Sequence, residues 1–105
     1  MSLSIEQTDF IVKEIQRILK KPVEIILFGS YAKGTQGAKS DIDIALRQAG
    51  PIDPALWSLI EEVFEQSDFT QSFDIVDYHR VKPDFQKVID QEGKPLDLSK
   101  SEINS

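Results

Sequence analysis

The chain has no cysteine among its 105 residues. This excludes disulfide bonds, thiolate metal sites and a cysteine nucleophile, and it is compatible with a reducing cytoplasm. No apolar run approaches the roughly 18 residues that a membrane-spanning helix needs. The sequence does not open with a basic segment followed by an apolar stretch, so we expect no signal peptide and a cytoplasmic location.

Positive charge is also scarce. The 12 Lys and Arg residues are outnumbered by 18 Asp and Glu residues, which gives a formal net charge of -6. Bulk binding to nucleic acid needs clustered positive charge, so we do not expect that function. Nucleotides are not excluded, because a bound cation can supply positive charge locally.

The apolar pattern predicts one layered α/β domain, with helices and strands in alternation. A capping box formed by Ser4 and Gln7 opens a helix over about 4–20. Further helices are expected over 53–66, where Asp53-Pro54 is a typical start, and over 83–93, with a short one near Ser30. Strands are expected over 23–28, 41–46 and 72–77. The inward side chains of the two later helices should be Leu56, Leu59, Ile60, Val63, Phe64, Phe85, Val88 and Ile89.

Residues 29–43 carry the strongest functional signal. Gly29-Ser30 follows the first predicted strand, ten residues intervene, and Asp41 and Asp43 open the second strand. Side chains two positions apart on a strand point the same way, so the two carboxylates should project together. They repel each other unless a cation lies between them, and their hard oxygens suit Mg²⁺ or Mn²⁺. Backbone N–H groups at a glycine turn that leads into a helix can hold phosphate.

A third carboxylate would complete a two-metal site, and the third predicted strand offers Asp74 and Asp77. These two have opposite parity, so only one of them can face the acid pair. We favour Asp74, because an aspartate inside a central strand is costly without a partner. Asp77 lies near the strand end, where a solvated or turn-capping aspartate is ordinary. We expect packing for Tyr31, solvated positions for Lys33 and Lys39, and a surface position without a catalytic role for His79.

The pair Gly29-Ser30, the ten-residue gap and Asp41-Ile42-Asp43 resemble the signature of the polymerase-beta-like nucleotidyltransferase superfamily. The short length resembles the minimal nucleotidyltransferases. Residues 73–77 are similar to the third-acid strand of the family, and 85–96 to its closing helix and final short strand. The resemblance implies a nucleotidyltransferase domain over 1–97, a small mixed sheet packed against helices, with a polar tail over 98–105.

The resemblance also implies a reaction. Asp41, Asp43 and Asp74 would be catalytic and hold two Mg²⁺ ions, while Gly29 and Ser30 would bind the triphosphate of ATP. AMP would pass to a hydroxyl acceptor. Minimal nucleotidyltransferases are commonly paired with a HEPN-type helical partner. In toxin–antitoxin pairs of this kind, the resemblance implies that the nucleotidyltransferase is the antitoxin and adds AMP to a tyrosine of the HEPN ribonuclease. Two alternatives stay open: a non-catalytic nucleotide- or partner-binding subunit, and a transferase that acts on a small molecule.

Overall fold

The chain folds into alternating helices and strands, as its apolar pattern predicts. The computed structural model describes residues 3–37 and 40–96. The elements, in chain order, are α1 (Ile5–Leu19), β1 (Glu24–Phe28), α2 (Gly29–Lys33), β2 (Ile42–Arg47), α3 (Pro54–Glu65), β3 (Phe73–Asp77), α4 (Pro83–Glu92) and β4 (Lys94–Pro95). Every predicted element is present. The ends of the elements predicted with bounds agree within one residue, and the short helix expected near Ser30 begins at Gly29. The tail predicted over 98–105 lies outside the described residues.

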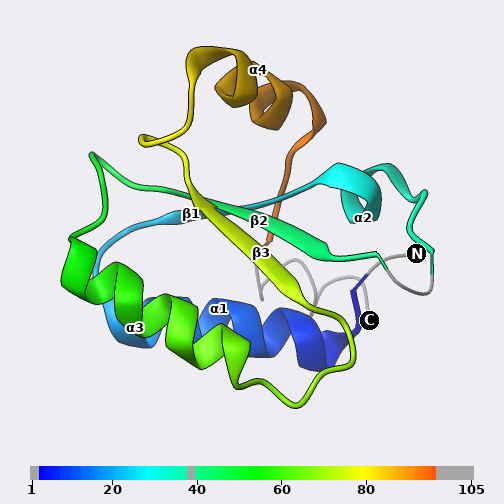
Figure 1. Ribbon diagram of the computed structural model, residues 1–105, viewed down its shortest axis with the longest axis horizontal. Coiled ribbons are helices and arrows are strands. Elements are labelled where there is room, and N and C mark those ends of the chain that lie inside the picture. The colour runs from blue at the N-terminus through cyan, green and yellow to red at the C-terminus, as the bar shows by residue number, and fades with distance from the viewer. Residues whose placement is uncertain (1–2, 38–39, 97–105) are drawn as a thin grey trace.

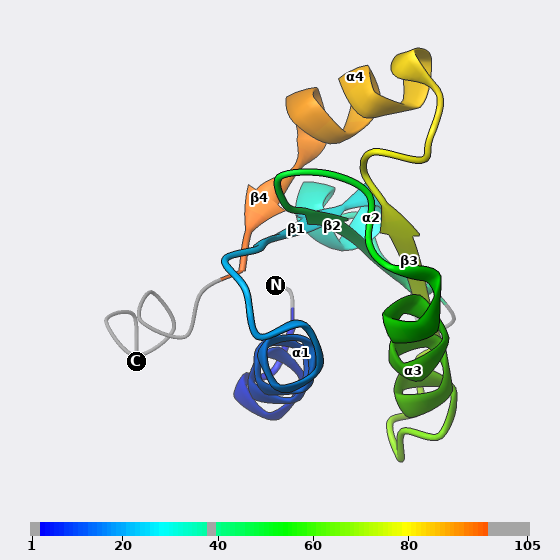
Figure 2. The same ribbon diagram turned by 90° about the vertical axis from the view of Figure 1, so that its left-hand side faces the viewer.

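The strands form one mixed sheet in the order β3-β2-β1-β4. Strand β1 pairs antiparallel with both β2 and β4, whereas β2 and β3 are parallel. Helices α1 and α3 lie on one face of the sheet and α4 lies on the other, with α2 at the end of β1 (Figures 1 and 2). This layered arrangement confirms the predicted fold class.

Local signals fix the starts of the helices that cover the sheet. Ser4 Oγ accepts a hydrogen bond from the Gln7 N–H at 3.0 Å, and Gln7 Oε1 accepts one from the Ser4 N–H at 2.9 Å. This is the capping box predicted for α1. At α3, Asp53 Oδ1 accepts from the Ala55 N–H at 2.8 Å, and proline occupies the first turn. None of the helices in the described ranges is long and apolar enough to cross a membrane.

Apolar side chains pack on both faces of the sheet. The larger core lies between the sheet and helices α1 and α3, and the smaller one, beneath α4, consists of Ile26, Phe28, Ala45 and Ile89. Two side chains predicted to point inward do not: Leu59 is 48% exposed and Phe85 is 36% exposed. Leu59 lies one position, about 100° around the helix, from the buried Ile60. Phe85, in the first turn of α4, lies at the margin of the smaller core.

Candidate active site

The pairing of the strands arranges the side chains beneath α4 in three rows across the sheet. Successive rows lie two residues apart, because alternate side chains of a strand share a face. We call them the acid row, the apolar row and the arginine row; they consist of Phe28, Asp43 and Asp74, then Ile26, Ala45 and Val76, then Glu24, Arg47 and Tyr78.

The acid row brings two of the predicted carboxylates side by side. Asp43 of β2 is the register partner of Asp74 of β3. Ile42 and Ile44, on either side of Asp43, are fully buried in the larger core on the opposite face. The alternation predicted for this strand is therefore confirmed. Asp41 precedes β2 by one residue and is exposed.

The carboxylates at this end of the sheet influence one another. Partial burial, followed by the negative charges of Asp74 and Asp41, raises the pKa of Asp43 from 3.8 to about 6. Among the described residues, no three acidic, histidine or cysteine side chains converge closely enough to form a complete metal site. Carboxylate oxygens are nevertheless the donors that Mg²⁺ prefers, and a divalent cation would offset the repulsion that Asp43 experiences. The residues present thus fit such a cation by their chemistry.

The glycine turn lies directly against the acid row. Gly29 has φ +73°, in the left-handed region, and follows Phe28 at the end of β1. A Cβ at Gly29 would lie 3.0 Å from Asp43 Cγ and would overlap Asp43 Oδ2. Glycine therefore suits this position: its φ is one that other residues rarely adopt, and a Cβ here would force the Asp43 side chain to shift. Ser30 is the second residue of α2, and its carbonyl accepts a hydrogen bond from the Thr35 N–H at 3.0 Å.

Asp77, the other candidate for the third carboxylate, has a different position. It is the register partner of Leu46 and is only 4% exposed. Its carboxylate accepts hydrogen bonds from the Ile52 N–H at 2.8 Å and the His79 N–H at 3.0 Å, and Arg80 Nε lies 3.4 Å away. Asp77 therefore caps the turn after β3, as expected, but the alternative of a solvated side chain is wrong.

Asp74 does not lie in a central strand, which corrects the prediction. Strand β3 is an edge strand of the described sheet, and Asp74 is exposed. The cost of burying a carboxylate in a central strand therefore does not apply to Asp74. Its place beside Asp43 follows from the parallel pairing of β2 and β3.

The other residues considered in the sequence have the following positions. Tyr31 is buried and His79 is exposed, as predicted. Lys33 is exposed, as predicted, and its Nζ also lies 3.3 Å from Glu92 Oε2. Lys39 lies outside the described residues. The sequence reasoning missed Phe28, whose place beside Asp43 was indicated only by its position immediately before Gly29.

The mixed sheet, with Asp43 beside Asp74 and the Gly29 turn against Asp43, has the features expected of a nucleotidyltransferase. The chain belongs to this class, since the family model described as "Polymerase beta, Nucleotidyltransferase" matches residues 12–102. The family resemblance noted in the sequence is thereby confirmed.

The proteins similar to this chain include two protein adenylyltransferases and a solved toxin–antitoxin structure. The probable protein adenylyltransferase MntA of Haemophilus influenzae is 32% identical over 79 residues, which are 75% of this chain and 69% of the relative. The protein adenylyltransferase MntA of Shewanella oneidensis is 34% identical over 87 residues, 82% of this chain and 61% of the relative. A crystal structure of a toxin–antitoxin with AMP-PNP superposes with a TM-score of 0.67 at 30% identity, covering 91% of this chain and 78% of that one.

Proposed function

We propose that this chain is a Mg²⁺-dependent protein adenylyltransferase. It transfers AMP from ATP to a tyrosine hydroxyl of a HEPN-type toxin in the cytoplasm, and so acts as an antitoxin. The observation that carries the proposal is the acid row, in which Asp43 lies beside Asp74 and the Gly29 backbone packs against Asp43. The two similar adenylyltransferases and the similar toxin–antitoxin structure with AMP-PNP support the transferred group and the kind of partner.

Each residue of the site has a proposed role. Asp41, Asp43 and Asp74 hold two Mg²⁺ ions, and the Gly29 N–H and Ser30 hold the terminal phosphates of ATP. When bound, the ions would stabilise the negative charge on the reacting phosphate and on the departing pyrophosphate. The raised pKa of Asp43 supports its role as a metal ligand. Burial and the neighbouring carboxylates disfavour the ionised form of Asp43, and a nearby cation would favour it.

The reaction is an in-line substitution at phosphorus. The tyrosine oxygen attacks the α-phosphorus of ATP, a new oxygen–phosphorus bond forms, and the bond to pyrophosphate breaks. The hydroxyl proton passes to the Asp74 carboxylate. Asp74 suits this role because it is exposed on an edge strand, where a side chain on the surface of another protein can reach it.

The proposal can be tested by label transfer. The chain is incubated with α-labelled ATP, Mg²⁺ and the HEPN-type protein encoded beside it. We expect the partner to be labelled, and a partner with its acceptor tyrosine changed to phenylalanine to stay unlabelled. Asp43→Asn should reduce the rate by at least roughly 100-fold, since a metal site supplies several kcal/mol of transition-state stabilisation. Asp68→Asn, the same change in the exposed loop after α3, should have no effect.

Other outcomes would identify the alternatives. Tight binding of the partner without label transfer, unchanged in Asp43→Asn, would indicate a non-catalytic subunit. Transfer of AMP only to a small molecule would indicate a nucleotidyltransferase that acts on small molecules. Either result would overturn the proposal.

A further inference from the structure

An exposed aromatic ring lies on the same side of the sheet as the acid row. Three large hydrophobic side chains of the described residues are exposed: Ile5, Leu59 and Phe85. Ile5 and Leu59 belong to α1 and α3, which cover the opposite face (Figure 2). Phe85 belongs to α4 and is the only one of the three on the side of Asp43 and Asp74.

The ring of Phe85 contacts the acid row at Phe28, the register partner of Asp43. It packs edge-on against Phe28, with ring centroids 5.6 Å apart and an angle of 81° between the planes. Phe28 is buried, is the register partner of Asp43 and immediately precedes Gly29. Phe85 therefore borders the place proposed for the triphosphate.

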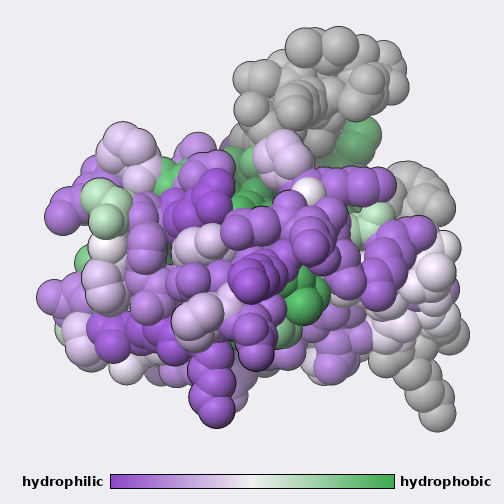
Figure 3. Space-filling model, turned by 90° about the horizontal axis from the view of Figure 1, so that it is seen from above, coloured by the Kyte–Doolittle hydropathy of each residue, from purple (hydrophilic) through white to green (hydrophobic). Residues whose placement is uncertain are grey.

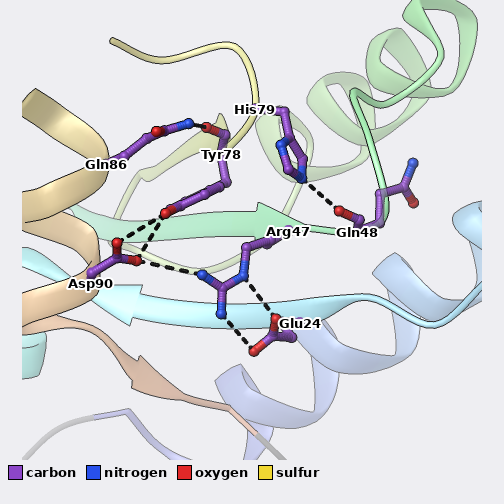
Figure 4. A network of polar contacts seen from close by, with 7 residues as sticks. All are labelled: Glu24, Arg47, Gln48, Tyr78, His79, Gln86 and Asp90. Atoms are coloured by element: carbon purple, nitrogen blue, oxygen red, sulfur yellow. Dashed lines mark hydrogen bonds and ion pairs between the residues drawn. The ribbon is translucent and has the colours of Figure 1, made fainter. Parts of the chain in front are cut away.

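Helix α4 is held in place over the sheet by polar contacts (Figure 4). Asp90 accepts a hydrogen bond from Tyr78 Oη at 3.0 Å, and Arg47 Nη1 lies 3.5 Å from the same carboxylate. Gln86 Nε2 donates to the Tyr78 carbonyl at 2.7 Å. These contacts fix α4 to the arginine row. The position of Phe85 is therefore set before a ligand arrives, which lowers the entropic cost of binding.

The visible surface on the side of the sheet that carries α4 favours a planar ligand over a broad protein interface (Figure 3). Seen from the side that carries α4, the surface is mainly hydrophilic, and hydrophobic residues form small separate areas (Figure 3). Protein docking surfaces are usually broader continuous apolar patches. A single aromatic ring beside a phosphate site has instead the chemistry of a stacking platform, because every nucleobase offers a π-face.

We propose that Phe85 stacks on the adenine ring of ATP bound at the acid row. The inference rests on the proposed function and adds the residue that holds the base. Stacking depends little on the identity of the base, so Phe85 should strengthen the binding of GTP about as much as that of ATP.

The test compares a ligand that has a base with one that has none. Calorimetry measures the affinity of the full chain for ATP and for inorganic tripolyphosphate, each with Mg²⁺. Phe85→Leu keeps an apolar contact with Phe28 but loses the π-face. It should weaken ATP binding by roughly 5- to 100-fold, in line with base–aromatic stacking, and leave tripolyphosphate affinity unchanged. Phe85→Trp should retain ATP affinity. Leu59→Ala, which alters a more exposed apolar side chain on the other face, should change neither affinity.

Three results would overturn the inference. Phe85→Leu could bind ATP as the unaltered chain does, could lose ATP and tripolyphosphate affinity equally, or could lose only affinity for the protein partner. Thermal melting of Phe85→Leu shows whether the variant is folded; if it is not, Phe85→Tyr and Phe85→Trp must both retain ATP affinity. Failure of the unaltered chain to bind either ligand with Mg²⁺ would instead refute the proposed function itself.

Discussion

Replacing Asp43 by asparagine should make the metal-free chain more stable while it removes activity. Burial, together with Asp74 and Asp41, raises the pKa of Asp43 from 3.8 to about 6. Between these pH values the folded chain binds a proton at Asp43 more tightly than the unfolded chain does. The free energy of unfolding therefore falls as pH rises from about 4 to about 6, and it stays lower above pH 6. Asparagine removes this loss because it cannot ionise.

The size of the effect follows from the pKa. A rise of about two pH units corresponds to about 3 kcal/mol, at 1.36 kcal/mol for each unit. Asp43 is only partly buried, however, and water screens its interactions with the two neighbouring carboxylates. We therefore expect Asp43→Asn to raise the free energy of unfolding at pH 7.5 by about 1 kcal/mol.

Urea unfolding with a metal chelator measures this difference. The gain from Asp43→Asn should be present at pH 7.5 and smaller at pH 4.5, where the unaltered side chain is largely protonated when folded. Mg²⁺ at pH 7.5 should stabilise the unaltered chain more than the variant. The control Asp68→Asn should change stability by less than about 0.5 kcal/mol at either pH. A variant that is less stable at pH 7.5, or one with an equal gain at both pH values, would refute the electrostatic reasoning.

Three further substitutions test other parts of the site. Gly29→Ala should lose about 1–3 kcal/mol more stability than Gly34→Ala, because both have positive φ but only Gly29 packs against the acid row; equal losses in urea unfolding would contradict this. Asp77→Asn should destabilise the chain by about 1–3 kcal/mol, since it weakens the acceptor of two buried or partly buried N–H groups; a stability gain like that of Asp43→Asn would contradict its turn-capping role. Arg47→Met should lower the free energy of unfolding by less than about 1 kcal/mol, because the ion pairs of Arg47 are partly exposed. It should nevertheless speed amide hydrogen exchange in α4, and unchanged exchange would show that Arg47 does not hold this helix.

The helices and strands could be predicted because their ends depend on local chemistry. The capping box at Ser4 and the Asp53-Pro54 start act within one turn of the chain, and they are present as expected. Gly93 shows the limit of this reasoning. It ends α4 as predicted, but its φ is -68°, so it is not a left-handed cap. A Cβ there would lie 2.5 Å from the Ile89 carbonyl oxygen and would overlap Ile26, so glycine is needed for close packing on β1.

The candidate site was predictable only in part. Parity along β3 showed that Asp74 and Asp77 point to opposite faces, because the period of a strand is two whatever its neighbours are. Strand order depends on contacts between distant residues, and the assumption that Asp74 lies in a central strand was therefore wrong. Helical spacing likewise identified the side of α4 that faces the sheet. It could not show how much of that side the sheet buries, so Phe85 was wrongly assigned to the core.

The face of the sheet beneath α4 carries carboxylates that repel each other, and it is also covered by that helix. The carboxylates and the contacts that attach α4 lie in different rows along the strands. Ile89 packs on the apolar row and Asp90 contacts the arginine row, so α4 is attached mainly away from the acids. Asp43 and Arg47 are four residues apart on β2, which is about 13 Å. Substitutions in the two rows should therefore act independently. The change in unfolding free energy of Asp43→Asn/Arg47→Met should equal the sum of the single changes within about 0.5 kcal/mol. A larger deviation would mean that α4 couples the acids to the arginine row, and that its attachment cannot be altered without disturbing the site.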